Sequence, residues 1–427
     1  MAVTNGKNGT VAPPASTLRE DLRKAIADLT AAVDDFVADP EAASRGGTAT
    51  HAQRSAIAAV AARAQALVKE PSEQGPELCR QASIAASTRL FSEWGVFEAI
   101  PRDGSVTYTD LAAMVKVEEV LIIRISRVLI SAGVLERVGT DKVAHTPNSR
   151  IFLDDNPAGH LYNLAWDNTF FTFPRLPQYF ETYGRKEPQT LNHVPVTYAQ
   201  GKPELAYYDM IAQSPAKTRT FMMAMSAMET SGPTAGVYDF SWVVSLLRSG
   251  HIAADRPVLV DVGGAKGHAI KAIVGEFPQL PLKRLILQDG PAVIESAVAM
   301  DEPELRGVKK MAVDFHAEQP VKGALLYFIR RCLHNYSDQV CINILKNLVD
   351  AMADDSKVLI MEDVIEDPPP EYVPFMDFVM LTFAGKQRTM SNWEKVISGA
   401  GLKISSISTA KGPWTISVME CVKAAAL

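Results

Sequence analysis

A glycine-rich turn follows an apolar stretch in the C-terminal half of the chain. Residues 258–262 read Val-Leu-Val-Asp-Val and lead directly into Gly263, Gly264 and Gly267. Glycine lets the backbone approach a ligand that any side chain would block, and Asp261 can hold a cationic or hydroxyl-bearing group. Plain strand-to-helix turns also use glycine, so the turn alone is a weak signal. No Lys-Ser or Lys-Thr pair follows it, which argues against a triphosphate-binding loop.

Two further acidic residues strengthen this signal. Asp289, followed by Gly290, closes the next apolar stretch, at a place where a carboxylate can accept both hydroxyls of a ribose. Asp314 and Phe315 then put an acid beside an aromatic ring, a pair that can hold and cover an adenine. Together with the glycine turn, these residues predict a site for an adenosyl cofactor.

His334 is the candidate for acid–base chemistry. It lies in the segment 330–338, just after the apolar stretch 325–329, and the near-neutral pKa of histidine suits a general base. A capping or core histidine is the structural alternative. Glu362 ends the next apolar stretch and can orient the imidazole. Asp363 is its rival, but successive strand residues face opposite ways, so only one of the two is expected to reach the site.

The elements that carry these residues alternate between apolar strands and helices from residue 257 onward. This pattern predicts a parallel sheet covered on both faces, with ligands bound beyond the carboxyl ends of its strands. Upstream, a helix over 118–132 and two strands over 134–138 and 142–145 resemble a winged helix, with Thr109 as the expected N-cap of the preceding helix. A winged helix can bind DNA, but the net charge of −6 favours a packing or dimerisation module without nucleic acid.

The composition is that of an ordinary globular protein, with 47% hydrophobic and 22% charged residues. No window approaches the roughly twenty apolar residues of a membrane-spanning helix, and the N-terminus lacks the apolar core of a signal peptide. These features predict a cytoplasmic protein without membrane contact. The four cysteines are scattered without a CxxC pair, so neither a disulfide framework nor a metal site is expected.

Five regions are expected along the chain. They are a disordered tail (1–17), N-terminal helices (18–74), the winged-helix domain (75–155), a helical linker and substrate-pocket segment (156–250), and the α/β domain (251–427). The aromatic residues of 156–250 are either core or the wall of a pocket for a flat or hydrophobic ligand.

The ordered set of motifs resembles plant-caffeate-type and fungal S-adenosylmethionine-dependent O-methyltransferases. The matching segments are 261–267, 288–289, 314–315, 330–338 and 385–389, and the likeness spans about residues 75–425. The resemblance implies an α/β fold with a Rossmann-like methyltransferase domain, an N-terminal winged-helix dimerisation domain, a homodimer and S-adenosylmethionine as cofactor.

The resemblance also implies roles for individual residues. Those that would contact the cofactor are Asp261, Gly263, Gly264, Gly267, Asp289, Gly290, Asp314, Phe315 and Arg330. His334 would remove the substrate proton and Glu362 would support it. The residues in segments that line the family's substrate pocket are Trp166, Met376, Met380 and Phe383.

Gln387 departs from the family pattern, because many members carry a second glutamate there. A neutral amide cannot stabilise an imidazolium as a carboxylate does, so the base would depend on Glu362 alone. Two hypotheses follow. The first is O-methylation of a phenolic or enolic hydroxyl on a polyketide-like or aromatic fungal metabolite. The second is a pericyclase or cyclase that binds S-adenosylmethionine without transferring its methyl group.

Overall fold

The computed structural model describes residues 15–38, 48–229, 232–366, 372–411 and 415–424. These residues form two compact units, which are described separately. The first contains the described residues up to Leu90 together with Ile123–Ala132, and the second contains Phe91–Ile122 and the described residues from Gly133 onward.

The first unit is helical. It holds α1 (Ala15–Ala38), α3 (Thr48–Val68), most of α4 (Gln74–Glu93) and most of α7 (Glu119–Ser131). The helices α1 and α3 pack against each other, and the Gln53 amide donates to Asp35 Oδ2 at 3.2 Å. The helices expected over residues 18–74 thus include α1 and α3. Of the expected tail over 1–17, residues 1–14 lie outside the described residues, and α1 already begins at Ala15.

The second unit begins with α5 (Val96–Ala99), β1 (Val106–Thr107) and α6 (Tyr108–Val115), and after α7 continues with β2 (Leu135–Val138) and β3 (Lys142–His145). The three strands pair in the antiparallel order β1-β3-β2, so the predicted hairpin is confirmed. The predicted N-cap was wrong. Thr107 rather than Thr109 caps α6, because Thr107 Oγ1 accepts the Asp110 N–H at 3.0 Å and Thr109 already lies inside the helix.

A helical segment connects this part to the large sheet. Its elements are η2 (Arg150–Phe152), α8 (Pro157–Ala165), the π-helix η3 (Trp166–Phe170), η4 (Phe173–Arg175), α9 (Leu176–Tyr183), α10 (Pro195–Ala199), α11 (Tyr207–Ala212), α12 (Pro215–Glu229) and α13 (Ser241–Arg248). Some of its aromatic residues belong to the core, as one of the two alternatives predicts. Tyr179 and Tyr207 are buried, whereas Phe170, Phe171 and Tyr208 are exposed.

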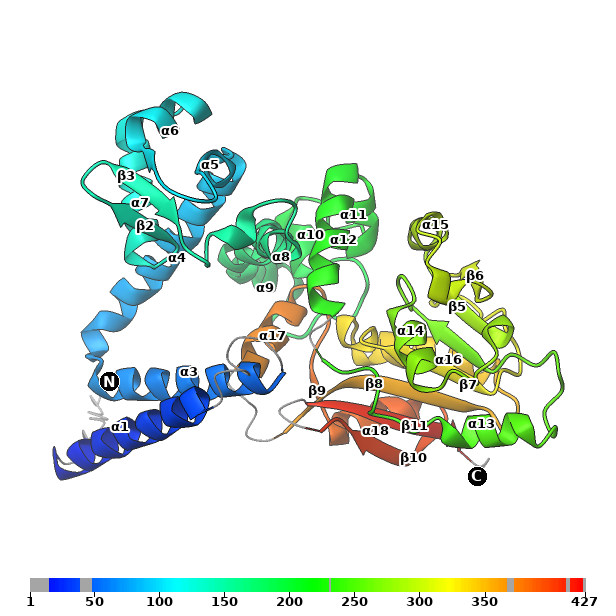
Figure 1. Ribbon diagram of the computed structural model, residues 1–427. Coiled ribbons are helices and arrows are strands. Elements are labelled where there is room, and N and C mark those ends of the chain that lie inside the picture. The colour runs from blue at the N-terminus through cyan, green and yellow to red at the C-terminus, as the bar shows by residue number, and fades with distance from the viewer. Residues whose placement is uncertain (1–14, 39–47, 230–231, 367–371, 412–414, 425–427) are drawn as a thin grey trace, which may run out of the picture. The chain divides into compact units, whose positions relative to one another are not determined.

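The large sheet has the strand order β10-β11-β8-β7-β4-β5-β6 (Figure 1). The strands are β4 (Leu259–Val262), β5 (Leu285–Asp289), β6 (Lys309–Ala312), β7 (Leu326–Arg330), β8 (Lys357–Ile365), β10 (Leu402–Thr409) and β11 (Ile416–Lys423), and short β9 (Arg388–Thr389) pairs with β8. The strands β4 to β8 run parallel, as predicted. The hairpin β10–β11 adds two antiparallel strands at one edge, which the sequence reading did not anticipate.

Alternating side chains of each strand supply two hydrophobic cores. Leu259, Leu287 and Phe328 face a core shared with α13, α14 (His268–Glu276) and α15 (Pro291–Ala299). Val260 and Tyr327 face the other core, which is shared with α16 (Asp338–Val349) and α18 (Met390–Gly399). The period of two residues therefore produces a sheet covered on both faces, and the predicted α/β class is confirmed. The carboxyl ends of the parallel strands meet at one edge.

Candidate active site

The glycine turn lies at the carboxyl end of β4, where the strand order reverses between β5 and β7. A Cβ atom on Gly264 would lie 2.4 Å from Asp261 Oδ2, and one on Gly263 would lie 2.8 Å from Cys332 Sγ. Gly267 has φ +83° and would meet Leu305 at 2.7 Å. Glycine at 264 is required by close packing on the buried Asp261 carboxylate, and Gly263 and Gly267 have φ values of +69° and +83° that side chains rarely adopt.

Asp261 is fully buried beneath this turn. Neither of its carboxylate oxygens has a hydrogen-bond partner among the described residues. Burial raises the pKa of Asp261 to about 7, the charge of Asp289 adds to the rise, and Arg330 opposes it. A buried carboxylate without a donor is costly, so this group is arranged to receive a cation or a hydrogen-bond donor.

Arg330 shows the same property with the opposite charge. It ends β7, the strand beside β4, and its buried Nε and Nη2 have no hydrogen-bond partner among the described residues. Burial and the like charge of Arg331 lower the pKa of Arg330. A ligand that carries both an ammonium and a carboxylate group, as the methionine part of S-adenosylmethionine does, can satisfy Asp261 and Arg330 together. These residues therefore fit the predicted cofactor.

Asp289 ends β5 on the other side of the turn. Its two carboxylate oxygens accept the N–H groups of Ala265 at 2.9 Å and Gly290 at 2.7 Å. Burial raises the pKa of Asp289, while these two N–H groups oppose the rise. Each carboxylate oxygen keeps a further lone pair, so the carboxylate is oriented and still able to accept ribose hydroxyls.

Asp314 and Phe315 follow β6, the next strand outward. Asp314 is exposed and its Oδ1 accepts the His316 N–H at 2.9 Å, which shapes the loop. The ring of Phe315 lies over the glycine turn, 3.3 Å from the position of a Cβ on Gly263, and 6.0 Å from the ring of Tyr336. The structure thus brings the predicted cofactor residues to one edge of the sheet.

His334 and Glu362 are in direct contact at the same edge. The distance from His334 Nδ1 to Glu362 Oε2 is 2.7 Å, and the Glu362 side chain is only 1% exposed. Its other oxygen accepts the N–H groups of Leu333 at 2.8 Å and His334 at 3.4 Å. Burial favours a raised pKa for Glu362, but the facing His334 and these donors hold the pKa below its ordinary value. Glu362 is therefore an ionised carboxylate that fixes the imidazole.

Asp363 points to the other side of β8, as strand alternation predicts. Its Oδ1 accepts the Thr415 hydroxyl at 2.5 Å, and its Oδ2 lies 3.9 Å from Arg331 Nη2. Of the two adjacent acids, only Glu362 contacts His334.

Gln387 lies in a segment that packs on the backbone of the histidine loop. The Lys386 N–H donates to the His334 carbonyl at 2.9 Å, and a Cβ on Gly385 would lie 2.3 Å from the same oxygen. The Gln387 N–H donates to Asp377 Oδ1 at 2.7 Å, while its side chain has no hydrogen bond to a described residue. Among the described residues, the Gln387 amide therefore has no hydrogen bond to His334 or Glu362.

The predicted substrate residues come from two segments. Met376 and Met380 lie one turn apart on α17 (Tyr372–Leu381), and Phe383 follows that helix. The ring of Phe383 lies 4.5 Å from that of Tyr207, within a buried cluster built from α10 and α11. Trp166 begins the π-helix η3, and its ring lies 5.8 Å from that of Phe170. The described ring contacts join Phe383 to Tyr207 and Trp166 to Phe170, and none of them joins one predicted substrate residue to another.

Two residues of the site were missed by the sequence reading. Asp377 orients the backbone of Gln387, and Arg388 hydrogen-bonds to the loop that carries His334. Asp377 lies beside Met376, and Arg388 lies in the segment 385–389 that carries the family resemblance. Their role depends on partners distant in sequence, so residue type alone gave no signal.

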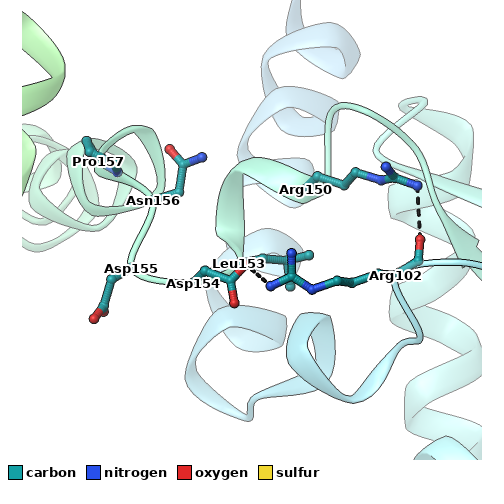
Figure 2. A pocket seen from close by; sticks show the side chains of 7 residues that line it. All are labelled: Arg102, Arg150, Leu153, Asp154, Asp155, Asn156 and Pro157. Carbon is teal, nitrogen blue, oxygen red and sulfur yellow. Dashed lines mark hydrogen bonds and ion pairs between the residues drawn. The ribbon is translucent and has the colours of Figure 1, made fainter.

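Other features lie outside this site. A cavity of about 400 Å³ is lined by Arg102, Arg150 and residues 153–157, and contains none of the predicted residues (Figure 2). Arg102 pairs there with Asp154, and Arg150 donates to the Arg102 carbonyl at 2.9 Å. The described residues contain no group of three or more metal-ligating side chains. Within the same ranges, no helix is long and apolar enough to cross a membrane.

Comparison with known proteins adds family information to this geometry. A family model described as an O-methyltransferase domain matches residues 188–403. A curated protein from Aspergillus candidus, named methyltransferase cfoD, is 35% identical over 359 residues, which cover 83% of this chain and 88% of the relative.

Solved structures resemble the chain over most of its length. The crystal structure of OxaC superposes with a TM-score of 0.82 at 21% identity and covers 95% of this chain and all of its own. The structure of LepI in complex with SAM gives a TM-score of 0.75 at 22% identity and covers 92% and 99% of the two chains. OxaC has also been solved with SAH and oxaline. These neighbours share the Rossmann-like methyltransferase fold.

Proposed function

We propose that this chain, which belongs to the O-methyltransferase family, methylates a hydroxyl group of a small metabolite with His334 as the general base. The observation that carries the proposal is the 2.7 Å contact between His334 and the buried Glu362, at the sheet edge that also holds the glycine turn. The proposed substrate is a phenol or enol on a polyketide-like or aromatic scaffold. S-Adenosylmethionine is the cofactor of the family and, when bound, supplies an electrophilic methyl group.

In the proposed reaction, Nε2 of His334 takes the proton from the substrate hydroxyl. Nδ1 is occupied by Glu362, which selects the tautomer with a free Nε2 lone pair. As the proton arrives, the charge of Glu362 stabilises the imidazolium, as the acid of a catalytic triad does. The remaining contribution of the protein is to hold the hydroxyl oxygen in line with the methyl group.

The cofactor is proposed to bind through its two ends. Asp261 and Arg330 would take the ammonium and carboxylate of its methionine part, because both oxygens of Asp261 and the Nε and Nη2 atoms of Arg330 are buried without a hydrogen-bond partner among the described residues. Asp289 would take the ribose, and Asp314 and Phe315 the adenine. Trp166, Met376, Met380 and Phe383 are proposed to contact the substrate.

A pericyclase or cyclase is the second candidate, because one fold neighbour is described as a pericyclic reaction enzyme, with a TM-score of 0.76. The neutral Gln387 also leaves His334 with one carboxylate instead of two. In that case His334 would donate a hydrogen bond to a substrate carbonyl, and the methyl group would stay on the cofactor.

One experiment separates the two candidates. The protein is incubated with a panel of phenolic and enolic polyketides and methyl-labelled S-adenosylmethionine, and label in product and S-adenosylhomocysteine are both followed. Methyl transfer predicts one labelled methyl on oxygen for each S-adenosylhomocysteine formed. A converted substrate without label, or a label found on nitrogen or carbon, would overturn O-methylation.

A homodimer is proposed for the first unit. Its helices expose apolar side chains, among them Ile26 at 61%, Val37 at 64% and Leu78 at 71%. Ile26 and Val37 are eleven residues apart on α1, so they lie on the same face of that helix, and apolar residues gathered on one exposed face mark protein–protein contacts. Light scattering after size exclusion should give twice the chain mass, and an Ile26→Glu, Val37→Glu variant should give the mass of one chain. A monomeric parent protein would overturn this proposal.

A further inference from the structure

We infer that Arg388 is the positioning residue of the active site, whose guanidinium fixes the short loop that presents His334. The inference deepens the proposed function, and only its activity readout rests on that function. Arg388 begins β9 directly after Gln387 and is fully buried, with 0% of its surface exposed. A charged side chain so deeply buried must have partners, and these partners identify its role.

The donors of Arg388 bracket His334 along the chain. Nη2 donates to the Tyr336 carbonyl at 2.7 Å, and Nη1 donates to the Leu333 carbonyl at 3.2 Å. These two carbonyls lie on either side of His334, in and directly after the one-turn 3-10 helix η7 (Leu333–Asn335). A single planar group therefore holds both ends of the turn.

The opposite side of the loop is held by Glu362. Its Oε1 accepts the backbone N–H groups of Leu333 and His334, while its Oε2 meets the imidazole. The N–H groups of the loop thus donate to the Glu362 carboxylate, and its carbonyls accept from the Arg388 guanidinium. Movement of the His334 backbone would require both sets of bonds to break, which is how a catalytic group is kept in one orientation.

The positive charge of Arg388 is met by the Asp338 carboxylate and by the face of an aromatic ring. Nε donates to Asp338 Oδ1 at 2.8 Å, and the guanidinium carbon lies 5.0 Å from the centre of the Trp393 ring. Lys386 Nζ also approaches Asp338 Oδ2, at 3.1 Å. The planar fork of arginine can reach several acceptors at fixed angles, whereas lysine offers one point of charge. Lysine at this position would keep the charge and lose the geometry.

Arg256 offers a matched control elsewhere on the same sheet. It also pairs with an acid, since Nη1 and Nη2 both lie 2.7 Å from Asp355 oxygens, and its Nε donates to the Gly323 carbonyl at 2.7 Å. Gly323 and Asp355 precede β7 and β8, so this arginine clamps the amino ends of the strands whose carboxyl ends carry the site. If the role of Arg388 were purely structural, its substitution would leave kcat of the folded enzyme unchanged, as we expect for Arg256.

The test compares Arg388→Lys, Asp338→Asn and Arg256→Lys in the full-length protein. We expect Arg388→Lys to lower kcat about 10- to 100-fold, with KM and the Kd for S-adenosylmethionine changed less than about threefold, because the glycine turn is untouched. Asp338→Asn should lower kcat less than about tenfold, since the carbonyl contacts remain. Arg256→Lys should lower the melting temperature and leave kcat of the folded enzyme unchanged.

A second readout does not depend on turnover. The proton between His334 Nδ1 and Glu362 should give a downfield NMR signal in the cofactor-bound parent protein, absent in His334→Asn. We expect this signal to be lost or broadened in Arg388→Lys and retained in Arg256→Lys. Retention of both the signal and kcat in Arg388→Lys would overturn the inference, as would equal losses in Arg256→Lys. A parent protein that shows the signal but transfers no methyl group would instead contradict the proposed function.

Discussion

The glycine turn and the histidine loop follow adjacent parallel strands, yet they satisfy their polar groups in opposite ways. At the turn, both oxygens of Asp261 are buried without a partner among the described residues, as are two nitrogens of Arg330, which ends the neighbouring strand β7. At the loop, the two oxygens of Glu362 accept hydrogen bonds and the donors of Arg388 reach three backbone carbonyls and a carboxylate.

We infer that the unpaired groups serve cofactor binding and that the fully hydrogen-bonded loop serves catalysis. Unpaired buried charges are costly in the free protein, and a ligand that satisfies them regains that free energy on binding. A base that must meet a transition state benefits instead from a frame that needs no rearrangement. We therefore expect changes at the turn to act on cofactor affinity and changes at the loop to act on turnover.

The largest effect is expected from His334→Ala. A positioned general base contributes about 10²- to 10⁴-fold, so kcat should fall by that factor in a methyl-transfer assay. The Kd for S-adenosylmethionine, measured by calorimetry, should stay within about threefold, because His334 is not part of the turn. His251→Ala, which removes an exposed histidine, is the control and should match the parent protein. Loss of cofactor binding in His334→Ala would remove the separation of the two regions.

Asp261→Asn should produce the complementary result. The Kd should rise about 10- to 100-fold, because the amide lacks the charge that meets the ammonium group. The cofactor-free variant should nevertheless be more stable than the parent at pH 8. The pKa of Asp261 is about 7 in the folded protein, above the ordinary carboxyl value of about 3.9. As the pH rises, the unfolded chain therefore releases this proton first, and the stability of the parent protein falls between these two pH values.

The size of that stability gain depends on pH. Above pH 7 the penalty of the buried carboxylate is fully present, and Asp261→Asn should raise the free energy of unfolding by about 1–3 kcal/mol. Near pH 4 the parent carboxyl is protonated in the folded state and the gain should vanish. Thermal unfolding at the two pH values measures the difference, with exposed Asp354→Asn as the control. A variant that is less stable than the parent at pH 8 would mean that Asp261 has a structural partner.

Cofactor affinity should itself depend on pH through the same group. Only ionised Asp261 attracts the ammonium, and its pKa of about 7 in the free protein, set by burial and Asp289 against Arg330, leaves it mostly protonated at pH 6. The Kd should therefore be about tenfold higher at pH 6 than at pH 7.5, with proton release on binding at the lower pH. Calorimetry in buffers of different ionisation enthalpy measures both, and Asp261→Asn should abolish the dependence. An equal Kd at the two pH values would contradict the assignment.

The contrast between the regions also explains what could be read from the sequence. The turn was predictable because its residues are local: an apolar strand, glycines and an acid at the strand end. Asp289 ends β5, as the sequence predicts, and strand alternation predicts that only one of Glu362 and Asp363 reaches the site, which in the structure is Glu362. Each of these inferences uses the geometry of a single element.

The loop was predictable only in part, because its order depends on distant partners. Arg388 donates to the carbonyls of Leu333 and Tyr336, more than fifty residues earlier in the chain. The spacing of residues 385–389 does not predict these partners. The pairing of β11 with β8 is also long-range, since it joins segments separated by α17 and α18. Long-range hydrogen bonds are the part of this site that composition and periodicity do not encode.

The smallest expected effect, from Gln387→Glu, tests how far the loop depends on one carboxylate. A second carboxylate beside the imidazole favours its protonated form, so the acid limb of the kcat/KM profile should move to higher pH by about one unit. The kcat at the optimum should change less than about tenfold, because Glu362 and Arg388 still fix the loop. Gln339→Glu on the exposed face of α16 adds the same charge as a control. An unchanged profile would mean that the side chain at 387 lies away from the ring.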